Sequence, residues 1–373
     1  MSVISKNYYS FKDLALQMGK DMSEADVINM ASRNKPIIED ALALPCNDGT
    51  KHKTLIKKGL PTYVLKALYG GVPASRGNKM PVEDTCSIIA SAAEIETDYI
   101  DIFEKAEDKK SARLEEASDH VEALGQGVET MVIYGNSSSN PRAPRGLVQR
   151  YSSLTAENGK NIIHGAGTIG GSDSGKCTSV WFITWDSTTV HLIYPKGAKA
   201  GVDQKDNGKI NKEGPEGTYF VYRDDFSWHV GVSLRDWRYV VRIAGIQAED
   251  LLTFVNAQKT IKYYSSASNA ITVNANLPDG SGGEINAASV AVADNIVGLF
   301  KLAYYQHEGR NQMKGKTFIY ANTLVVAALD FMVDLGLPGF SRSEIENGAE
   351  VLKFRGIRIR ECAAILNTED PLQ

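Results

Sequence analysis

The stretch SVWFITWDSTTVHLIYPKG, residues 179–197, decides the fold of this 373-residue chain. Its first part, SVWFITW, is a continuous apolar run of strand length, which is typical of a central strand covered on both faces. The pattern then alternates, and Val190, Leu192 and Tyr194 share one face. Two further strands are expected in SWHVGVSL (227–234) and WRYVVRI (237–243). The middle of the chain is therefore predicted to form a buried sheet.

The residues before that run, GAGTIGGSDSGK (165–176), carry the letters of two nucleotide-binding motifs. Gly165, Gly167 and Gly170 fit G-x-G-x-x-G, and Gly170, Gly175 and Lys176 fit the start of a P-loop. Both motifs place phosphate at the N-terminus of a helix, whereas a strand is expected here. The residue after the lysine is a cysteine, which lacks the hydroxyl that binds magnesium. We therefore expect a glycine-rich surface loop, with a P-loop nucleotide-binding enzyme as an alternative.

Helical patterns surround the expected sheet without a regular alternation of strand and helix, which indicates an α+β fold. Helices are expected over 98–133, 247–257, 287–304 and 322–335. The first has one apolar stripe, formed by Leu114, Val121, Leu124, Val128, Met131 and Val132. Near the end, VLKFRG and IRIREC are predicted to form a strand pair that turns near Gly356.

The bulk composition is that of an ordinary globular protein, with 43% hydrophobic and 23% charged residues. A net charge of −4 requires neither a nucleic acid nor an anionic membrane as the main partner. No apolar run approaches the roughly 20 residues of a membrane span, and the first residues do not resemble a secretory signal. The four cysteines are far apart and are expected to be buried free thiols of a cytosolic chain.

No catalytic, cofactor-binding or metal-binding residue is assigned. The segment 203–214 resembles a calcium loop, but Lys205 and Gly214 occupy two ligand positions, so a polar turn loop is expected. A turn is also expected at the carboxylate pair Asp224–Asp225, and a structural ion pair at Asp236. His191 and His229 lie in strands, where hydrogen-bonded structural roles are favoured over metal ligation.

Two neighbouring segments carry opposite charge. Residues 54–72 and 82–96 are predicted to be two extended arms joined by a turn-rich tip, ASRGNKMP (74–81). Residues 51–82 contain seven basic and no acidic side chains, whereas residues 94–129 contain twelve acidic and four basic ones, a net −8. The acidic helix is either a solvated charged face or a docking surface for the basic arm of a neighbouring copy.

Six long segments, in order, resemble the major capsid proteins of epsilon15-like tailed bacteriophages. They are LYGGV (68–72), DTCSIIASAAEIE (84–96), YGNSSSNPRAPRGLVQRYSSL (134–154), SVWFITWDSTTVHLIYPKG (179–197), WHVGVSLRDWRYVVRIAGI (228–246) and FRGIRIRECAAILNTE (354–369). The similarity runs from about Leu60 to Glu369 and departs in a longer N-terminal arm and in the polar stretch 266–286.

The resemblance implies the Hong Kong 97 capsid fold. Its expected parts are an N-terminal arm (1–55), an extended loop (56–97), a peripheral domain with a long spine helix (98–147), an axial domain (148–350) and closing strands (351–373). It further implies hexamers and pentamers in an icosahedral shell around double-stranded DNA, without sequence-specific DNA binding. Decoration or cement, scaffold and portal proteins are expected partners. Neither a membrane nor a cofactor is expected, and assembly is expected in the host cytoplasm. An encapsulin-like cargo compartment is the alternative on the same fold.

Within that implied shell, we hypothesise that the basic loop of one copy lies against the acidic helix of its neighbour. Apolar burial would supply most of the affinity, and exposed ion pairs would set register and partner choice. The residues assigned to this contact are Lys57, Lys58, Lys66, Arg76, Lys79, Glu104, Glu107, Glu115, Glu116, Asp119 and Glu122.

Overall fold

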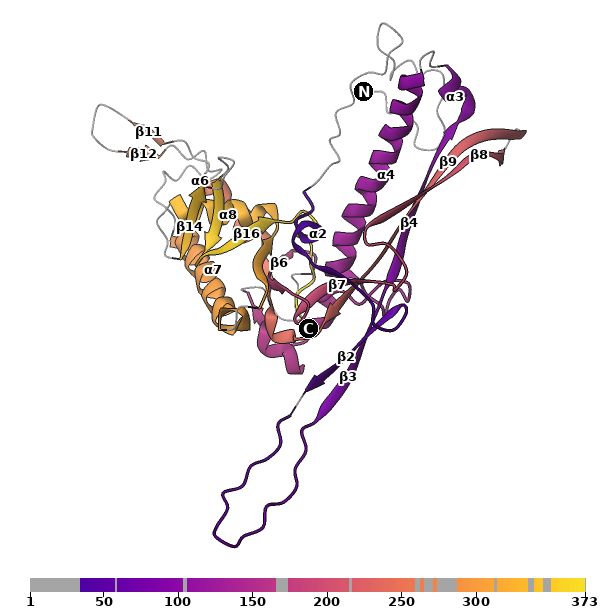
Figure 1. Cartoon of the computed structure of the whole chain (residues 1–373). Helices are drawn as coiled ribbons and strands as arrows, with labels where there is room; N and C mark the ends of the chain where they lie inside the picture. The colour runs from indigo at the N-terminus through magenta and orange to yellow at the C-terminus, as the bar shows by residue number, and fades with distance from the viewer. Residues whose placement is uncertain are drawn as a thin grey trace. The chain divides into compact units, whose positions relative to one another are not determined.

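The apolar run at the centre of the chain is the central strand of a mixed sheet. In the computed structural model it forms β6 (Cys177–Trp185), and all nine of its residues are buried. It pairs antiparallel with β10 (Val240–Gln247) and with β13 (Lys316–Ala321), so that Ile183 lies opposite both Val240 and Phe318. The burial of every residue confirms the prediction of a strand covered on both faces. Figure 1 labels β6 beside the other elements of the chain.

The structure describes residues 34–57, 59–102, 106–165, 174–214, 217–258, 262–264, 271–273, 287–311, 314–334, 339–344 and 350–372. The chain forms two compact units. The first contains Met1–Arg33, which lies outside the described residues, with Ile88–Val128 and Ala198–His229, and the second contains Asn34–Ser87, Glu129–Gly197 and Val230–Gln373. Most of the glycine-rich loop 165–176 and most of the polar stretch 266–286 also lie outside the described residues.

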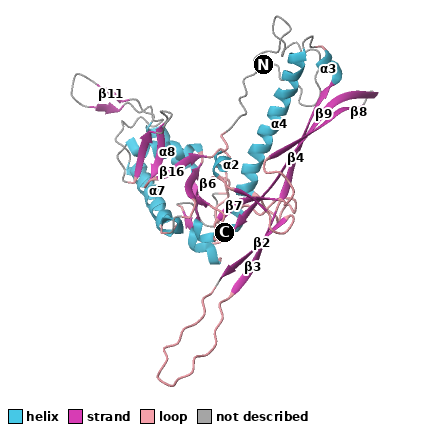
Figure 2. Ribbon diagram, viewed as in Figure 1, coloured by secondary structure: helices cyan, strands magenta, loops and turns pink. Residues whose placement is uncertain are grey.

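In the second unit, strands follow one another in the order β14-β15-β16-β13-β6-β7-β9. Figure 2 distinguishes the strands, in magenta, from the helices, in cyan. Their bounds are Phe340–Glu344, Glu350–Phe354 and Ile357–Glu361 for β14 to β16, Val190–Tyr194 for β7 and Gly217–Leu234 for β9. Beside this path, β5 (Ile162–His164) pairs parallel with β10, and β1 (Ala43–Pro45) pairs parallel with β7. The expected turn near Gly356 is confirmed, because β15 and β16 are antiparallel and Gly356 has φ +85°.

Three helices pack against this sheet in the second unit: α6 (Ala248–Gln258), α7 (Ala287–Gln306) and α8 (Thr323–Asp334). Phe300 of α7 lies at the centre of an aromatic group with Phe182, Phe340 and Phe354, at ring-centroid distances of 5.7, 5.3 and 5.4 Å. Smaller elements of this unit are α2 (Pro36–Asp40), α5 (Leu147–Arg150), η1 (Glu157–Asn161), η2 (Trp237–Tyr239), η3 (Glu308–Arg310) and the strand pair β11 (Lys262–Tyr264) and β12 (Ile271–Val273).

The first unit combines a long helix with three strands. Its elements are β4 (Ser87–Glu96), α3 (Thr97–Asp101), most of α4 (Ala106–Tyr134), β8 (Val202–Gly214) and the first part of β9. Its core is small and consists of Ala93, Leu124 and Phe226, with partly buried residues around them. Two members of the expected apolar stripe are not in a core: Leu114 is 68% exposed and Val121 is 40% exposed. Ala112 and Ala117 occupy the covered side of that part of the helix instead.

The expectation of turns at 203–214 and at Asp224–Asp225 is wrong. The first segment is β8, a mostly exposed strand that pairs antiparallel with β9, and its register shifts between Asp206 and Lys209 where Gly208 has φ +67°. The two carboxylates lie within β9. The pattern of β8 is polar on both faces, so neither alternation nor composition indicates a strand, and backbone pairing to β9 determines its conformation.

Candidate assembly surfaces and their anchors

Residues 51–85, which include most of the expected extended loop, form a long hairpin in the second unit. Strand β2 (Lys51–Lys57) pairs antiparallel with β3 (Lys79–Thr85), so that Lys57 lies opposite Lys79. Gly59 and Asn78 then exchange two backbone hydrogen bonds of 3.3 and 3.2 Å. The chain reverses at Ala67–Gly70, where the Gly70 N–H donates to the Ala67 carbonyl and Tyr69 has φ +65°. The tip is therefore at 67–70 and not in ASRGNKMP, which belongs to the returning arm.

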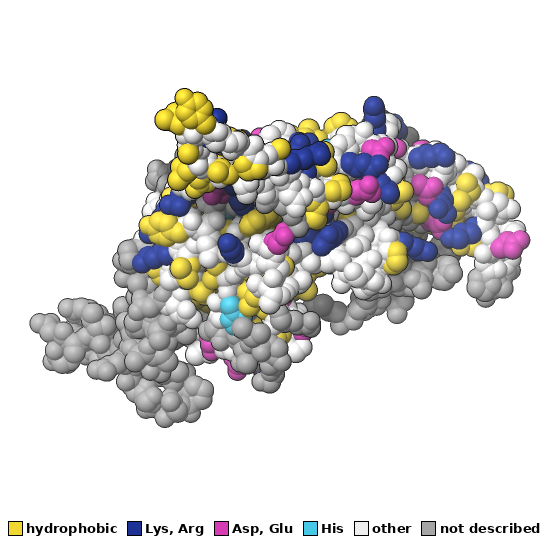
Figure 3. Space-filling view, turned by 90° about the horizontal axis from the view of Figure 1, so that it is seen from below, with side chains coloured by type: hydrophobic (Ala, Val, Ile, Leu, Met, Phe, Trp, Pro, Cys, Tyr) yellow, Lys and Arg dark blue, Asp and Glu magenta, His cyan; other side chains and the backbone are white. Residues whose placement is uncertain are grey.

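Large apolar side chains line this hairpin and are left uncovered by the described residues. Leu65, Leu68 and Tyr69 at the tip are 93%, 92% and 104% exposed, and Leu60, Tyr63, Val64 and Val72 are also exposed. A contiguous exposed apolar surface of this kind marks a site of association. Figure 3 shows hydrophobic side chains gathered in one protruding part of the surface, with Lys and Arg side chains near them.

The basic residues assigned to the contact lie on the same hairpin. Lys57, Lys66, Arg76 and Lys79 are all exposed, and none forms an ion pair with a described residue, whereas Lys58 lies outside the described residues. The other two lysines of the segment are neutralised locally. Lys51 pairs with Glu83 at 3.7 Å and Lys53 pairs with Asp48 at 2.5 Å.

The acidic residues assigned to the contact lie on α4 in the first unit. Glu115, Glu116 and Glu122 are half-buried and Asp119 is exposed; Glu104 lies outside the described residues, and so does the side chain of Glu107. Glu116 lies 3.5 Å from His120, and Glu122 accepts a hydrogen bond from Gln126. Glu94 of β4 pairs with Arg223 and Lys212 of the same unit. The net negative charge counted from the sequence is thus partly neutralised within the unit.

A buried ion pair anchors the base of the hairpin. The Asp84 carboxylate of β3 accepts hydrogen bonds from Arg150 Nη2 at 2.7 Å and from the Leu234 N–H at 3.2 Å. Arg150 also donates to the Val232 carbonyl at 3.0 Å. The side chains of Asp84 and Arg150 are only 2% and 6% exposed. A buried charge without its partner is strongly destabilising, so this pair fixes β3 to the end of β9 and to α5.

Two buried histidines lie at the same end of the hairpin. His52 of β2 and His191 of β7 meet edge to face at a centroid distance of 5.2 Å. Burial lowers the pKa of both rings, that of His191 to about 4, so both are neutral at pH 7. The expectation of a hydrogen-bonded His191 is wrong, because neither of its ring nitrogens has a hydrogen-bond partner within the described residues.

The C-terminal segment is held by a buried polar network. Glu369 accepts hydrogen bonds from Arg242 Nη2 at 2.9 Å, Ser179 Oγ at 2.6 Å and Tyr134 Oη at 2.5 Å. Its backbone exchanges two hydrogen bonds with Cys177 at the start of β6. This network therefore joins the C-terminal segment to the central strand, to β10 and to the end of α4.

Two acidic side chains, Glu129 and Asp40, hold the segment that precedes β1. Glu129 of α4 is 2% exposed and accepts a hydrogen bond of 2.8 Å from the Ile37 N–H. Burial raises the pKa of the Glu129 carboxyl to about 7. Asp40, which follows in α2, pairs with Arg360 at 3.0 Å and accepts a hydrogen bond from the Tyr320 hydroxyl.

The carboxylates of Asp224 and Asp225 are engaged by neighbouring side chains. Asp224 is paired with Arg113 at 2.9 Å, whereas Asp225 accepts hydrogen bonds from Arg223 and Asn207. The Arg223 guanidinium lowers the pKa of the Asp225 carboxyl. The expected structural ion pair at Asp236 is confirmed, with Arg238 at 2.8 Å. Both aspartates of β9 are thus structural.

The P-loop alternative lacks its helix. Lys176 is exposed, and the next element is the strand β6, so no helix N-terminus follows the lysine. Within the described residues, no group of three or more His, Cys, Asp or Glu side chains could hold a metal ion. Among the described helices, none combines the length and apolar character that a membrane crossing requires.

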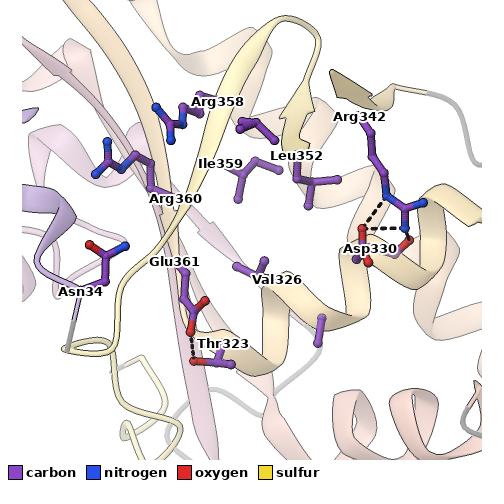
Figure 4. Close-up of a pocket in the computed structure, with 12 residues that line it drawn as sticks. Asn34, Thr323, Val326, Asp330, Arg342, Leu352, Arg358, Ile359, Arg360 and Glu361 are labelled. Carbon is purple, nitrogen blue, oxygen red and sulfur yellow. Dashed lines mark hydrogen bonds and ion pairs between the residues drawn. The ribbon is translucent and has the colours of Figure 1, made fainter. Parts of the chain in front are cut away.

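A groove of about 470 Å³ lies beside α8 and β16 (Figure 4). Several of its charged groups are already engaged: Arg342 pairs with Asp330 at 2.7 Å, and the Thr323 hydroxyl donates to Glu361 at 2.6 Å. Arg358 and Arg360 also line it. Paired side chains of this kind suit a structural role and present no nucleophile beside a base.

Comparison with known proteins shows the family of this chain. The family model of major capsid protein GP7 matches residues 19–373. No match is found among curated protein sequences. Bacteriophage epsilon15, solved at near-atomic resolution, contains a similar chain with a TM-score of 0.69 and 24% identity over 100% of this chain and 99% of that chain.

More distant structures are the bacteriophage JBD30 capsid and the holo-SrpI encapsulin complex from Synechococcus elongatus PCC 7942. The first has a TM-score of 0.46 and 9% identity over 90% of this chain and 92% of that one. The second has a TM-score of 0.41 and 9% identity over 64% and 96%. The α+β fold is thus the Hong Kong 97-like capsid fold that the resemblance implied. The chain belongs to the family of major capsid protein GP7 and is a structural subunit of a phage capsid.

Proposed function

We propose that copies of this chain associate as hexamers and pentamers into an icosahedral shell that encloses double-stranded phage DNA, with the extended hairpin as the main contact between copies. The observation that carries the proposal is the uncovered apolar surface of the hairpin, at Leu65, Leu68 and Tyr69 above all. The family match supports self-association into a virion shell. Assembly takes place in the host cytoplasm, and portal, scaffold and decoration proteins complete the particle.

The proposed division of the chain follows the implied fold. The arm is 1–55, the extended loop 56–97, the peripheral domain 98–147, the axial domain 148–350 and the closing segment 351–373. The loop of one copy lies against the acidic face of α4 in a neighbour, which brings Lys57, Lys66, Arg76 and Lys79 towards Glu115, Glu116, Asp119 and Glu122. Lys58, Glu104 and Glu107 complete the proposed contact.

The free energies of apolar burial and of exposed ion pairs assign different roles to the apolar and the charged side chains. Burying one Leu or Tyr side chain contributes about 1.5–3 kcal/mol, whereas an exposed ion pair contributes roughly 0–1 kcal/mol and is screened beyond about 8 Å in physiological salt. The apolar tip therefore supplies affinity. The charges set the register and make the association rate depend on salt.

The test separates these roles in the full-length chain. The triple variant Leu65→Ser, Leu68→Ser, Tyr69→Ser is expected to leave capsomers or monomers in place of closed shells, as measured by electron microscopy and analytical ultracentrifugation. The charge reversal Lys57→Glu, Lys58→Glu, Lys66→Glu is expected to slow assembly most at low salt, and Glu115→Lys, Glu116→Lys is expected to restore it. Lys160→Glu, on an exposed lysine outside the hairpin, is the matched control.

Normal assembly of the apolar triple variant would refute the role of the hairpin. Unchanged assembly of the charge reversal at low and moderate salt would refute the register role alone. The encapsulin-like alternative is decided by the particle contents, because packaged double-stranded DNA supports the phage shell and packaged protein would contradict it.

A further inference from the structure

Two thiols meet at the base of the extended hairpin. Cys46 follows β1 and Cys86 links β3 to β4, and their Sγ atoms are 3.2 Å apart. Each residue is held by a backbone hydrogen bond: the Cys46 N–H donates to the Tyr194 carbonyl at 2.8 Å, and the Cys86 N–H donates to the Thr50 carbonyl at 3.2 Å. Nothing in the proposed assembly uses this contact.

The separation is close to that of a bond. The sulfur atoms of a disulfide are about 2.05 Å apart, so the two Sγ atoms must approach by roughly 1 Å, which small side-chain rotations supply. The backbone hydrogen bonds keep the two residues in place while the side chains rotate. Both cysteines are free in this structure.

We propose that Cys46 and Cys86 are a modification site, at which a two-electron oxidant of the disulfide or azo class forms an intrachain disulfide. Each thiol loses one proton and one electron, the two S–H bonds break and one S–S bond forms. A small-molecule disulfide is reduced to two thiols in the same reaction, after a mixed disulfide on the first cysteine is attacked by the second. An azo oxidant such as diamide is reduced to the hydrazine.

The disulfide would close a ring that contains the whole hairpin. The ring runs from Cys46 through β2, the tip and β3 to Cys86. It would fix the end of β1 to the junction of β3 and β4, in addition to the Asp84–Arg150 ion pair. Oxidation would therefore restrict opening at the base of the hairpin and leave the exposed apolar tip unchanged.

The burial of the two thiols determines the rate at which the disulfide forms. Burial raises the pKa of both thiols, and only the thiolate attacks a disulfide, so little of the reactive form is present at pH 7. Below the pKa, the thiolate fraction rises about tenfold for each pH unit, so we expect the rate of bond formation to rise roughly a hundredfold from pH 7 to pH 9. The pair stays reduced during brief exposure to an oxidant and becomes oxidised during long exposure.

The experiment uses the full-length chain, treated with diamide or glutathione disulfide at pH 7, 8 and 9, then alkylated and digested without reductant. We expect a linked peptide containing Cys46 and Cys86, reversed by dithiothreitol, with a rate that rises with pH. We also expect amide hydrogen exchange in β2 and β3 to slow several-fold after oxidation. Cys46→Ala and Cys86→Ala must abolish the link, whereas Cys177→Ala, at a fully buried cysteine, must preserve it.

Two results would overturn the proposal. The first is the absence of the linked peptide at every pH in the wild-type chain, a readout that does not depend on the folding of any variant. The second is a link between isotopically labelled and unlabelled copies, which would place the bond between subunits and not within one.

Discussion

The substitution Asp84→Asn is expected to loosen the extended hairpin from the rest of the second unit. It removes the negative charge that faces Arg150 at 2.7 Å while both side chains are almost fully buried. Breaking one partner of a buried ion pair costs about 3–5 kcal/mol, because the other charge is left uncompensated. For 373 residues, an unfolding entropy of about 2.1 cal/mol/K per residue sums to about 0.8 kcal/mol/K, so the melting temperature should fall by about 4–6 °C.

The neighbouring residue provides a matched control. Glu83 lies on the same strand, but its carboxylate is about half exposed and faces Lys51 at 3.7 Å and Lys53 at 3.9 Å. Exposed pairs contribute roughly 0–1 kcal/mol, so Glu83→Gln should lower the melting temperature by about 1 °C or less. The double variant Asp84→Asn, Arg150→Met removes both buried charges and should recover part of the loss.

The assay is differential scanning calorimetry of the assembled particles at one scan rate, with amide hydrogen exchange in β2 and β3 as a local readout. Asp84→Asn should speed exchange in the hairpin strands, and the double variant should reverse part of that change. Equal melting temperatures for Asp84→Asn and Glu83→Gln would refute the reasoning, as would a double variant less stable than either single one.

Three further predictions concern the other buried groups. The pKa of His191 is about 4 in the folded chain and 6.5 when the ring is exposed, so the stabilisation of the folded state by the neutral ring is present above pH 6.5 and is lost as the pH falls to 4. The variant His191→Phe should lose up to about 3 kcal/mol less stability than wild type over that pH range, as measured by melting curves at a series of pH values. Burial raises the pKa of Glu129 to about 7, so the stabilisation of the folded state by the protonated carboxyl is present below pH 4.5 and is lost as the pH rises to 7. The variant Glu129→Gln should therefore become more stable than wild type from pH 5 to pH 8, by up to about 3 kcal/mol. Parallel plots of stability against pH for the two proteins would contradict this prediction. Arg242→Met leaves the Glu369 carboxylate buried without its cation and should cost about 3–5 kcal/mol in denaturant unfolding, with the C-terminal segment cleaved faster by protease; unchanged cleavage would argue against the anchor.

Sequence patterns predicted the elements whose burial is decided locally. The run in β6 is apolar along its whole length, and such a run can only be covered on both faces. The closing pair β15–β16 also followed from pattern and turn residues, whereas the two strands of the hairpin are 51–57 and 79–85 in place of the expected arms 54–72 and 82–96. The position of the turn in the hairpin was not predicted from the sequence. The register that places Lys57 opposite Lys79 puts the turn at 67–70, whereas composition favours the glycine- and proline-containing stretch after it.

The anchors were not predictable from sequence because their partners are distant in the chain. Asp84 and Arg150 are 66 residues apart, and Arg242 and Glu369 are 127 residues apart. Each of these residues, seen alone, resembles an ordinary surface charge. The only signal in the sequence is that Arg242 lies in a strand of apolar residues, WRYVVRI, where an unpaired cation would be costly.

The exposed apolar residues and the buried charges have one explanation in a subunit that must associate. Leu114, at 68% exposed on α4, lies on the helical stripe that the sequence predicts for a core, as the uncovered leucines of the hairpin lie on a predicted strand arm. A chain that folds alone gains nothing from such side chains, whereas a chain in a shell gains when a neighbour covers them. Association through a projecting hairpin also requires a fixed direction, which apolar contacts alone do not provide. Hydrogen-bonded charges such as Asp84 and Arg150 provide it, because their geometry tolerates little displacement. If so, weakening the base of the hairpin should impair closed-shell formation even where the apolar tip is intact.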